Sequence, residues 1–351
     1  MRALLERGHS VRALVRATSR LDALDGLPIE LRRGDVFSGA DVRRAATGCD
    51  VLFHAAGEFT YGVHDLATLE RTAVDGSLSV LAAAKRAGVR RVVATSSSVV
   101  FGYAHDGRVR DETAPVQPSA GDPPYVVSKV RQDRAIGERA AELGLDVVLA
   151  CPTMSIGPFA TMLGPSNGAI VTYFADPFHL TYAGGCNLVS ARDVGAGHVL
   201  LAERGRAGEH YLLGGENLEW RAIHSLIAEL AGVPGPSTVA GRTACLLAAQ
   251  AEEWRARLER RPPLTTREQA GMVDRYYWYS HRKAAALGHR PRPARVALAE
   301  AVAWLATSAH VSRAVRADMT LAREVYDARA GIAAREAALR ASRRPRKPRA
   351  A

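Results

Sequence analysis

The stretch RRVVATSSSVVFG, residues 90–102, decides the fold class of this chain. A short apolar run, Val92 to Ala94, is followed at once by four hydroxyl residues, Thr95 to Ser98. Buried parallel strands have nearly continuous apolar runs of this kind, and ligands bind beyond their carboxyl ends. The stretch therefore predicts a buried strand whose end carries polar side chains into a ligand site.

Similar runs recur through the first part of the chain, with helical patterns between them. The other strand-like runs are residues 10–16, 29–35, 50–56 and 146–152, and the helical patterns are residues 40–47, 66–87 and 124–143. Regular alternation of strand and helix predicts an α/β fold with a doubly wound parallel sheet. We assign this fold to residues 1–155.

The pattern loosens after Pro152 and predicts two further parts. Residues 156–306 have mainly helical periodicity, which predicts a smaller substrate-binding lobe partly threaded back into the sheet. Residues 307–351 are expected to form a helical extension and a basic, disordered tail. Residues 335–351 hold seven basic residues and one acidic residue, which is +6 of the net charge of +11. The net charge of the whole chain therefore says little about the charge of its folded part.

Composition excludes several classes of protein. The sequence has no apolar run of about 18 residues that would cross a bilayer, and no signal peptide is recognisable. The four cysteines are scattered without metal-like spacing, which indicates reduced thiols in a cytoplasmic protein with no metal site. The basic tail has no interleaved aromatic residues, so we expect it to be solvated and not to bind nucleic acid.

The segment YVVSK, residues 125–129, carries the chemistry that we expect. Tyr125 and Lys129 are four residues apart and would share one face of a helix. An ammonium beside a phenol favours the phenolate and lowers its pKa, so Tyr125 would exchange a proton with a hydroxyl or carbonyl oxygen. Ser97, at the end of the preceding strand, would hold that oxygen. Tyr279 and Lys283 have the same spacing, but no comparable strand end precedes them.

These residues carry a family resemblance. Together with CPTMSIGP (residues 151–158), the TSSS and YVVSK motifs resemble the extended short-chain dehydrogenase/reductases, also called the NAD-dependent epimerase/dehydratase family. The similarity covers roughly residues 1–306 and is greatest to the dihydroflavonol-reductase-like and hopanoid-associated sugar epimerase branches. It implies a Rossmann-like fold, a catalytic set of Ser97, Tyr125 and Lys129, and a homodimer paired through helices near 66–87 and 124–143.

The resemblance also implies a site for NADP or NAD over the sheet. The residues that it assigns to the cofactor are Arg16, Asp35, Val36, Ala55, Ala56, Lys129 and Pro152. Arg16 ends the strand-like run of residues 10–16, which corresponds to the second strand of the family. At this position NAD-preferring enzymes usually carry an acidic residue for the ribose hydroxyls. An arginine there would instead meet the 2′-phosphate, so NADP is favoured.

The sequence departs from the family pattern at Ala73, at Ser190, where many relatives carry histidine, and at its start. Ala73 replaces the asparagine of a helix motif, a change that we expect to lower activity. Family members also begin with a strand and a glycine-rich turn that points helix N–H groups at the cofactor pyrophosphate. Here Met1 falls within the helix that should follow that turn. We expect the missing strand and turn to precede this residue, and the chain as written to be poorly stable and to bind NAD(P) weakly.

The motifs favour an NAD(P)-dependent oxidoreductase that reduces a carbonyl or oxidises a secondary alcohol of a small molecule. Two alternatives stay open. One is a nucleotide-sugar epimerase or dehydratase, which would use the same three residues with transient oxidation. The other is a non-catalytic remnant, which the absent glycine loop supports and the intact triad opposes. The substrate and the direction of the reaction are not encoded in these motifs.

Overall fold

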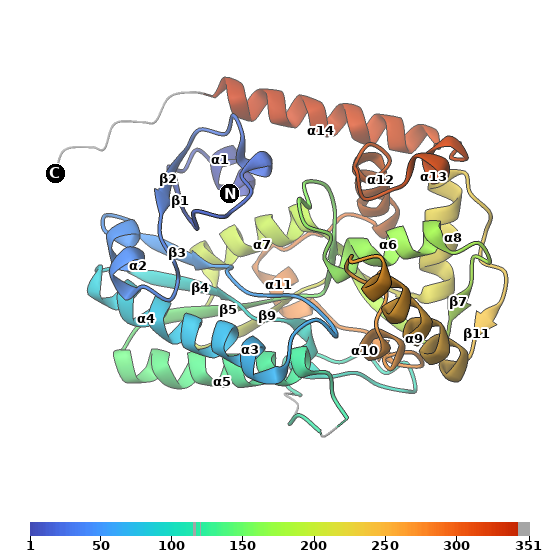
Figure 1. Cartoon of the computed structure of the whole chain (residues 1–351). Helices are drawn as coiled ribbons and strands as arrows, with labels where there is room; N and C mark the ends of the chain where they lie inside the picture. The colour runs from blue at the N-terminus through green and yellow to red at the C-terminus, as the bar shows by residue number, and fades with distance from the viewer. Residues whose placement is uncertain (115–116, 120, 343–351) are drawn as a thin grey trace.

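The computed structural model describes residues 1–114, 117–119 and 121–342. A parallel four-stranded sheet lies at its centre, in the order β3-β4-β5-β9 (Figure 1). These strands are Val51–His54, Arg91–Thr95, Asp146–Pro152 and His210–Leu213. Val93 pairs with Phe53 on one side and Val148 on the other, so the apolar run of residues 90–102 occupies an interior strand as predicted.

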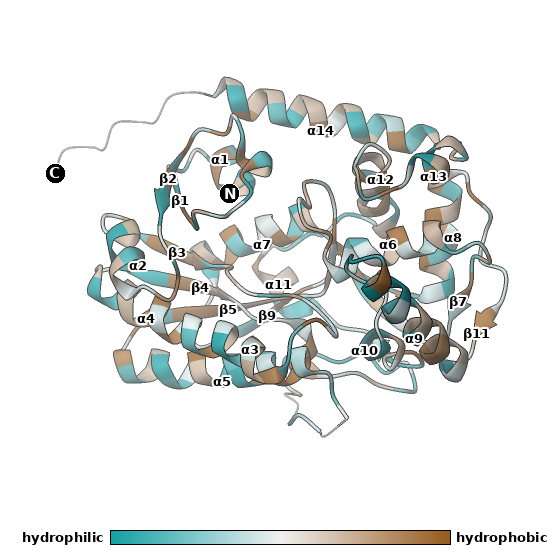
Figure 2. Cartoon of the chain, in the orientation of Figure 1, coloured by the Kyte–Doolittle hydropathy of each residue, from teal (hydrophilic) through white to brown (hydrophobic). Residues whose placement is uncertain are grey.

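Helices cover both faces of this sheet (Figure 1). On one face α4 (Gly76–Arg86) and α5 (Pro124–Leu143) pack Leu81 and Ile136 against the strands, with both side chains fully buried. On the other face α7 (Ala191–Arg204) and α11 (Arg282–Leu287) pack against β5 and β9. In Figure 2 the helices on either side of the central strands carry both hydrophilic and hydrophobic residues along their length. The predicted α/β fold with a parallel sheet is confirmed.

The first two strands form a separate parallel pair. β1 (Val11–Val15) follows α1 (Arg2–Glu6), and β2 (Ile29–Arg33) follows the 3-10 turn η1 (Asp22–Leu24). Within the described residues β1 pairs only with β2, and β3 pairs only with β4. Apolar contacts through α2 (Gly39–Ala46) and α4 connect this pair to the main sheet.

The helix predicted for residues 66–87 is continuous but changes pitch. It consists of α3 (Leu66–Glu70), a π-helical turn η2 (Arg71–Asp75) and then α4. Single π turns are often found at functional sites. Ala73 is buried in this turn, and its carbonyl accepts a hydrogen bond from Oγ of Ser77 at 2.5 Å.

The second half of the chain builds the smaller lobe around its own apolar core. Its sheet joins β6, β8, β10 and β12, which are Met154–Ile156, Gly185–Ser190, Glu216–Glu219 and Tyr276–Tyr277; β7 (Thr181–Tyr182) pairs with β11 (Val239–Ala240). Its helices are α6 (Pro165–Ala175), α8 (Trp220–Ala231), α9 (Arg242–Leu258), α10 (Arg267–Ala270) and α12 (Ala294–Leu305). No helix of the described residues combines the length and apolarity needed to span a bilayer.

The C-terminal region corrects one expectation. After α13 (Arg313–Ala317), α14 (Arg323–Ala341) runs across the molecule and contacts α1 and α12 (Figure 1). Arg335, where we expected a disordered tail to begin, lies in this helix and forms an ion pair with Glu6, while Glu336 accepts from Arg2 at 2.5 Å. Leu339 is buried, so this segment does pack an apolar face. Residues 343–351 of the predicted tail lie outside the described residues.

Candidate active site

The site is assembled where the central strands end. β4 finishes at Thr95, and Ser97 then caps a short 3-10 turn, η3 (Ser98–Phe101). The Oγ of Ser97 accepts a hydrogen bond from the backbone N–H of Val99 at 3.4 Å. Ser97 is buried with extended backbone dihedrals, so the chain stays extended for two residues past the end of β4.

Tyr125 lies in the first turn of α5, where Pro124 starts the helix without needing a backbone donor. Its ring is 5% exposed and packs against Phe59 and Tyr61, with centroid distances of 4.9 and 5.3 Å. Burial raises the pKa of Tyr125 to about 12, and the nearby hydroxyl of Ser97 opposes that rise. The structure therefore brings the side chains of Ser97 and Tyr125 close together, one from a strand end and the other from a helix start.

Lys129 lies one turn further along α5 and is also buried. Its Nζ donates to Oε1 of Gln132 at 2.8 Å. Burial lowers the pKa of Lys129 to about 8, and the nearby carboxylate of Asp133 opposes that shift. The expectation that Lys129 lowers the pKa of Tyr125 is not met, because burial of the phenol dominates.

The second tyrosine–lysine pair is arranged differently. Tyr279 precedes α11 and donates from its hydroxyl to the carbonyl of Gly102 at 2.6 Å, whereas Lys283 is inside α11 and binds Glu209 at 2.5 Å. The two side chains therefore do not share a helix face. Tyr279 is a buried link between the lobe and the turn after β4.

The end of β3 offers an open backbone to a ligand. Ala55, Ala56 and Gly57 follow His54 and are exposed. A Cβ placed on Gly57 would lie only 3.5 Å from Nζ of Lys129, so the ammonium lies directly behind this small-residue segment. Pro152 ends β5 beside Leu213 of β9, half-buried. Small exposed residues backed by an ammonium fit the ribose and diphosphate of a dinucleotide.

The other predicted cofactor residues lie on the separate strand pair. Arg16 follows β1 and is exposed, and its carbonyl accepts from Nη1 of Arg33 at 2.9 Å. Asp35 follows β2 and accepts the backbone N–H of Phe37 at 3.0 Å. Val36 packs against the apolar cluster of α2 and α4. These residues lie close together because Val15 pairs with Arg33, but on a different hydrogen-bonded sheet from Ser97.

Sequence patterns missed several side chains around the site. Phe59 and Tyr61 follow β3 in an irregular loop, and no pattern placed them over Tyr125. Gln132 and Ser77 are buried beneath Lys129, and Gln132 donates to Ser77 at 2.8 Å. The three-residue step from Lys129 to Gln132 is the one available signal, since residues so spaced are neighbours on a helix.

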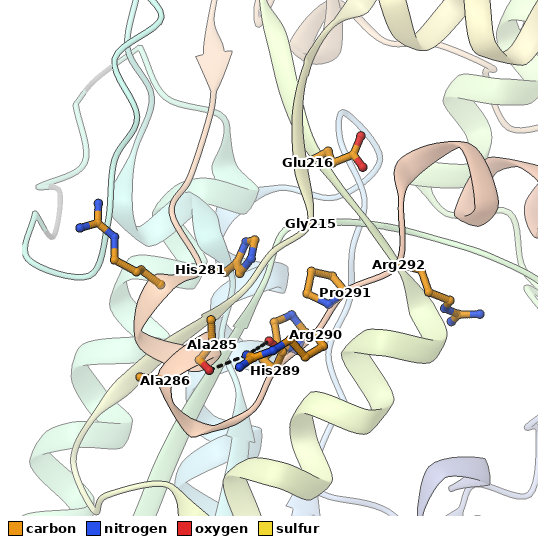
Figure 3. A pocket seen from close by; sticks show the side chains of 10 residues that line it. Gly215, Glu216, His281, Ala285, Ala286, His289, Arg290, Pro291 and Arg292 are labelled. Carbon is orange, nitrogen blue, oxygen red and sulfur yellow. Dashed lines mark hydrogen bonds between the residues drawn. The ribbon is translucent and has the colours of Figure 1, made fainter.

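Two hollows elsewhere do not include the triad. One of 640 Å³ lies between α11, the loop after it and the turn between β9 and β10 (Figure 3). Arg290 in this hollow already donates to the carbonyls of Ala285 and His289, and Arg292 binds Asp193. The other, of 550 Å³, lies between α1, α7, α12 and α14.

Comparison with known proteins identifies the family of this chain. A family model described as the NAD dependent epimerase/dehydratase family matches residues 1–214. A Synechocystis protein named "Putative dihydroflavonol 4-reductase" is 34% identical over 89% of this chain and 92% of its own length. Sterol demethylase protein B of Methylococcus capsulatus is 31% identical over 87% of this chain and 93% of its own length. The crystal structure of gox2253 matches with a TM-score of 0.76 and 32% identity, over 89% of this chain and 96% of that one.

The parallel α/β fold and these similarities define an NAD(P)-dependent enzyme that is an oxidoreductase or an epimerase. The chain belongs to the NAD-dependent epimerase/dehydratase family. That membership does not favour the non-catalytic alternative.

Proposed function

We propose that this enzyme reduces the carbonyl group of an apolar small molecule, with NADPH as the reductant. The observation that carries the proposal is the buried contact between Ser97 and Tyr125 at the strand ends, with Lys129 one helical turn away. Ser97 orients the carbonyl oxygen, and Tyr125 donates the proton that this oxygen receives. Lys129 holds the ribose and supplies positive charge.

The cofactor, when bound, supplies the hydride that reduces the carbonyl carbon. Ala55, Ala56 and Pro152 would provide the surface for its ribose and diphosphate, and Asp35 and Val36 would hold the adenine. The preference for NADP rests on Arg16 and its neighbour Arg33, two exposed guanidinium groups at the ends of paired strands. Arginine is well suited to a phosphate because it donates in a planar fork.

The apolar substrate class rests on the side chains that cover Tyr125. Phe59 and Tyr61 present aromatic rings to the phenol, and Phe59 is 40% exposed at the surface. Aromatic walls suit a flat apolar carbonyl compound better than a strongly hydrated nucleotide sugar. The two relatives, one named as a reductase and the other as a sterol demethylase protein, are consistent with this class.

Epimerisation or dehydration of a nucleotide sugar is the second candidate, favoured by the name of the matching family. It would use Ser97, Tyr125 and Lys129 with a transient oxidation and no net use of cofactor. We also propose a homodimer paired through the helix α3–α4 and α5, which lie side by side on one face of the sheet. Light scattering during gel filtration tests that assembly.

Deuterium transfer distinguishes the two activities. The enzyme is incubated with NADPH deuterated at the nicotinamide C4 and with apolar aromatic ketones and aldehydes. We expect one cofactor to be oxidised per alcohol formed, with deuterium on the carbinol carbon. Conversion of a nucleotide sugar without net cofactor oxidation, and no reduction of any carbonyl compound, would overturn the reductase proposal.

A further inference from the structure

A buried chain of hydrogen bonds ends on Lys129. Its centre is Oγ of Ser77, which lies 2.5 Å from the carbonyl oxygen of Ala73, 2.8 Å from Nε2 of Gln132 and 2.9 Å from Nε2 of His54. Gln132 in turn accepts the 2.8 Å hydrogen bond from Nζ of Lys129. The chain therefore links β3, the π turn, α4 and α5.

The chemistry of these groups fixes the direction of every hydrogen bond. The carbonyl of Ala73 only accepts, so the single hydroxyl proton of Ser77 must point to it. Oγ of Ser77 then accepts from both remaining partners, which are the amide NH₂ of Gln132 and Nε2–H of His54. Burial lowers the pKa of His54 to about 4, so this ring is neutral and carries its proton on Nε2.

One consequence is the orientation of the Gln132 amide. With its NH₂ committed to Ser77, its oxygen must face the other way, toward Lys129. The side chains of Gln132, Ser77 and His54 are 1%, 0% and 4% exposed, so water does not compete for these hydrogen bonds. Each side chain of this buried chain has a hydrogen-bond partner within it, which favours a single arrangement.

We propose that Gln132 is a positioning residue, held in one orientation by Ser77 and His54, which fixes the protonated Lys129 behind Gly57. The inference rests on the role assigned to Lys129 in the proposed function. It also gives Ala73 a role. The backbone carbonyl of this residue sets the direction of all the hydrogen bonds in the series, and this role does not depend on its side chain. Ser77 acts on Lys129 only through Gln132, whereas the ring of His54 also faces the charge of Lys129 directly.

Other charged or titratable groups also face Lys129, and the test must separate them from Gln132. Asp133 of α5 favours the ammonium, as does Cys151 of β5, while burial opposes it. Asp133 is itself held by Ser96 at 2.5 Å and by His210 at 2.6 Å. None of these contacts passes through Ser77, so a substitution at Ser77 isolates the proposed chain.

The scarcity of lysine makes a direct measurement practical. The sequence has four lysines, Lys85, Lys129, Lys283 and Lys347, so a protein labelled with ¹³C at lysine Cε gives four side-chain signals. The signal that disappears in Lys129→Met belongs to Lys129. Its chemical shift is followed from pH 6 to pH 11 in the whole chain, without cofactor. The midpoint of this titration is the pKa of Lys129.

The expected changes in the Lys129 titration midpoint differ in sign between variants. Gln132→Met keeps the shape but removes the acceptor, so the Lys129 midpoint should fall by about one pH unit, the size of one lost charge-assisted hydrogen bond. Ser77→Ala should lower it in the same direction, although Ser77 does not contact Lys129. Gln132→Glu keeps the acceptor, adds negative charge and should raise the midpoint. Gln250→Met, the same change on the exposed side of α9, should leave it unchanged.

An unchanged Lys129 midpoint in Ser77→Ala would overturn the proposal, and this variant decides it even if Gln132→Met does not fold. The result is independent of turnover. Shifted midpoints in an enzyme that reduces no carbonyl compound would leave the positioning role standing and remove the proposed function.

Discussion

The rings of Tyr61 and Tyr125 meet edge to face, with centroids 5.3 Å apart, and Phe59 packs on the same phenol at 4.9 Å. This aromatic cover keeps water from Tyr125, and burial raises the pKa of the phenol to about 12. Tyr125 therefore stays protonated throughout the range in which the enzyme is assayed, as a proton donor for carbonyl reduction must.

The pH dependence of cofactor binding should follow Lys129 and not Tyr125. The pKa of Lys129 is about 8, so its ammonium is present below that pH and is lost above it. We expect calorimetry to show NADPH affinity falling roughly tenfold between pH 7 and pH 9.5, as most of the ammonium is titrated. In Lys129→Met the affinity should be low and independent of pH. An affinity for the unmodified protein that stays constant to pH 9.5 would contradict the role of Lys129.

Replacing Lys129 should also stabilise the fold. The pKa of Lys129 is lower in the folded protein than its ordinary value of 10.5, so the unfolded chain binds this proton more tightly. Burial of the ammonium therefore costs stability below about pH 8, and that cost disappears as the pH rises toward 10.5. We expect Lys129→Met to raise the free energy of unfolding by ~2 kcal/mol at pH 7.

Urea denaturation at pH 7 and pH 10 measures this effect. The difference between Lys129→Met and the unmodified protein should narrow at the higher pH. A variant that is less stable at pH 7 would show that the hydrogen bond to Gln132 outweighs the burial of the charge.

Helix α14 should be a structural part of the fold. Leu339 is 4% exposed, so Leu339→Ala should lower the free energy of unfolding by about 2–3 kcal/mol. Leu247→Ala on α9 is the matched control, because Leu247 is 67% exposed and its truncation should change stability little. Equal effects of the two substitutions, measured by urea denaturation, would mean that α14 is not docked.

The preference between cofactors should depend on Arg16. We expect Arg16→Ala to lower kcat/KM for NADPH by about tenfold and to leave the value for NADH nearly unchanged, since only NADPH carries the 2′-phosphate. Arg313→Ala, an exposed arginine of α13, is the control. A parallel loss for both cofactors would place Arg16 outside the phosphate site.

The parts of the fold that could be predicted from sequence are those governed by local pattern. The run at residues 90–102 and the helix at residues 124–143 are continuous periodic segments, and their strand and helix match the prediction closely. The predicted strand end located Ser97. The four-residue spacing predicted that Lys129 shares a helix face with Tyr125. Each of these inferences needed only neighbours in the chain.

The rest depends on contacts between distant residues. Gln132 and Ser77 are 55 positions apart, and Arg2 and Glu336 are 334 apart, so no periodicity connects them. The docking of α14 was missed because its charge pattern resembles that of a solvated tail. The pKa of Tyr125 could not be predicted either, because it is set by Phe59 and Tyr61 in an irregular loop.

The most direct test of the proposed function compares Tyr125→Phe with Tyr279→Phe. Each substitution removes one hydroxyl, and only Tyr125 contacts Ser97 at the strand ends. We expect Tyr125→Phe to lower kcat for carbonyl reduction by at least about a hundredfold while NADPH affinity is kept, as expected for a lost general acid. Tyr279→Phe should lower stability and leave kcat within a few-fold of the unmodified enzyme. A Tyr125→Phe enzyme with near-normal kcat, or an equal loss in both variants, would contradict the assignment of Tyr125 as the proton donor.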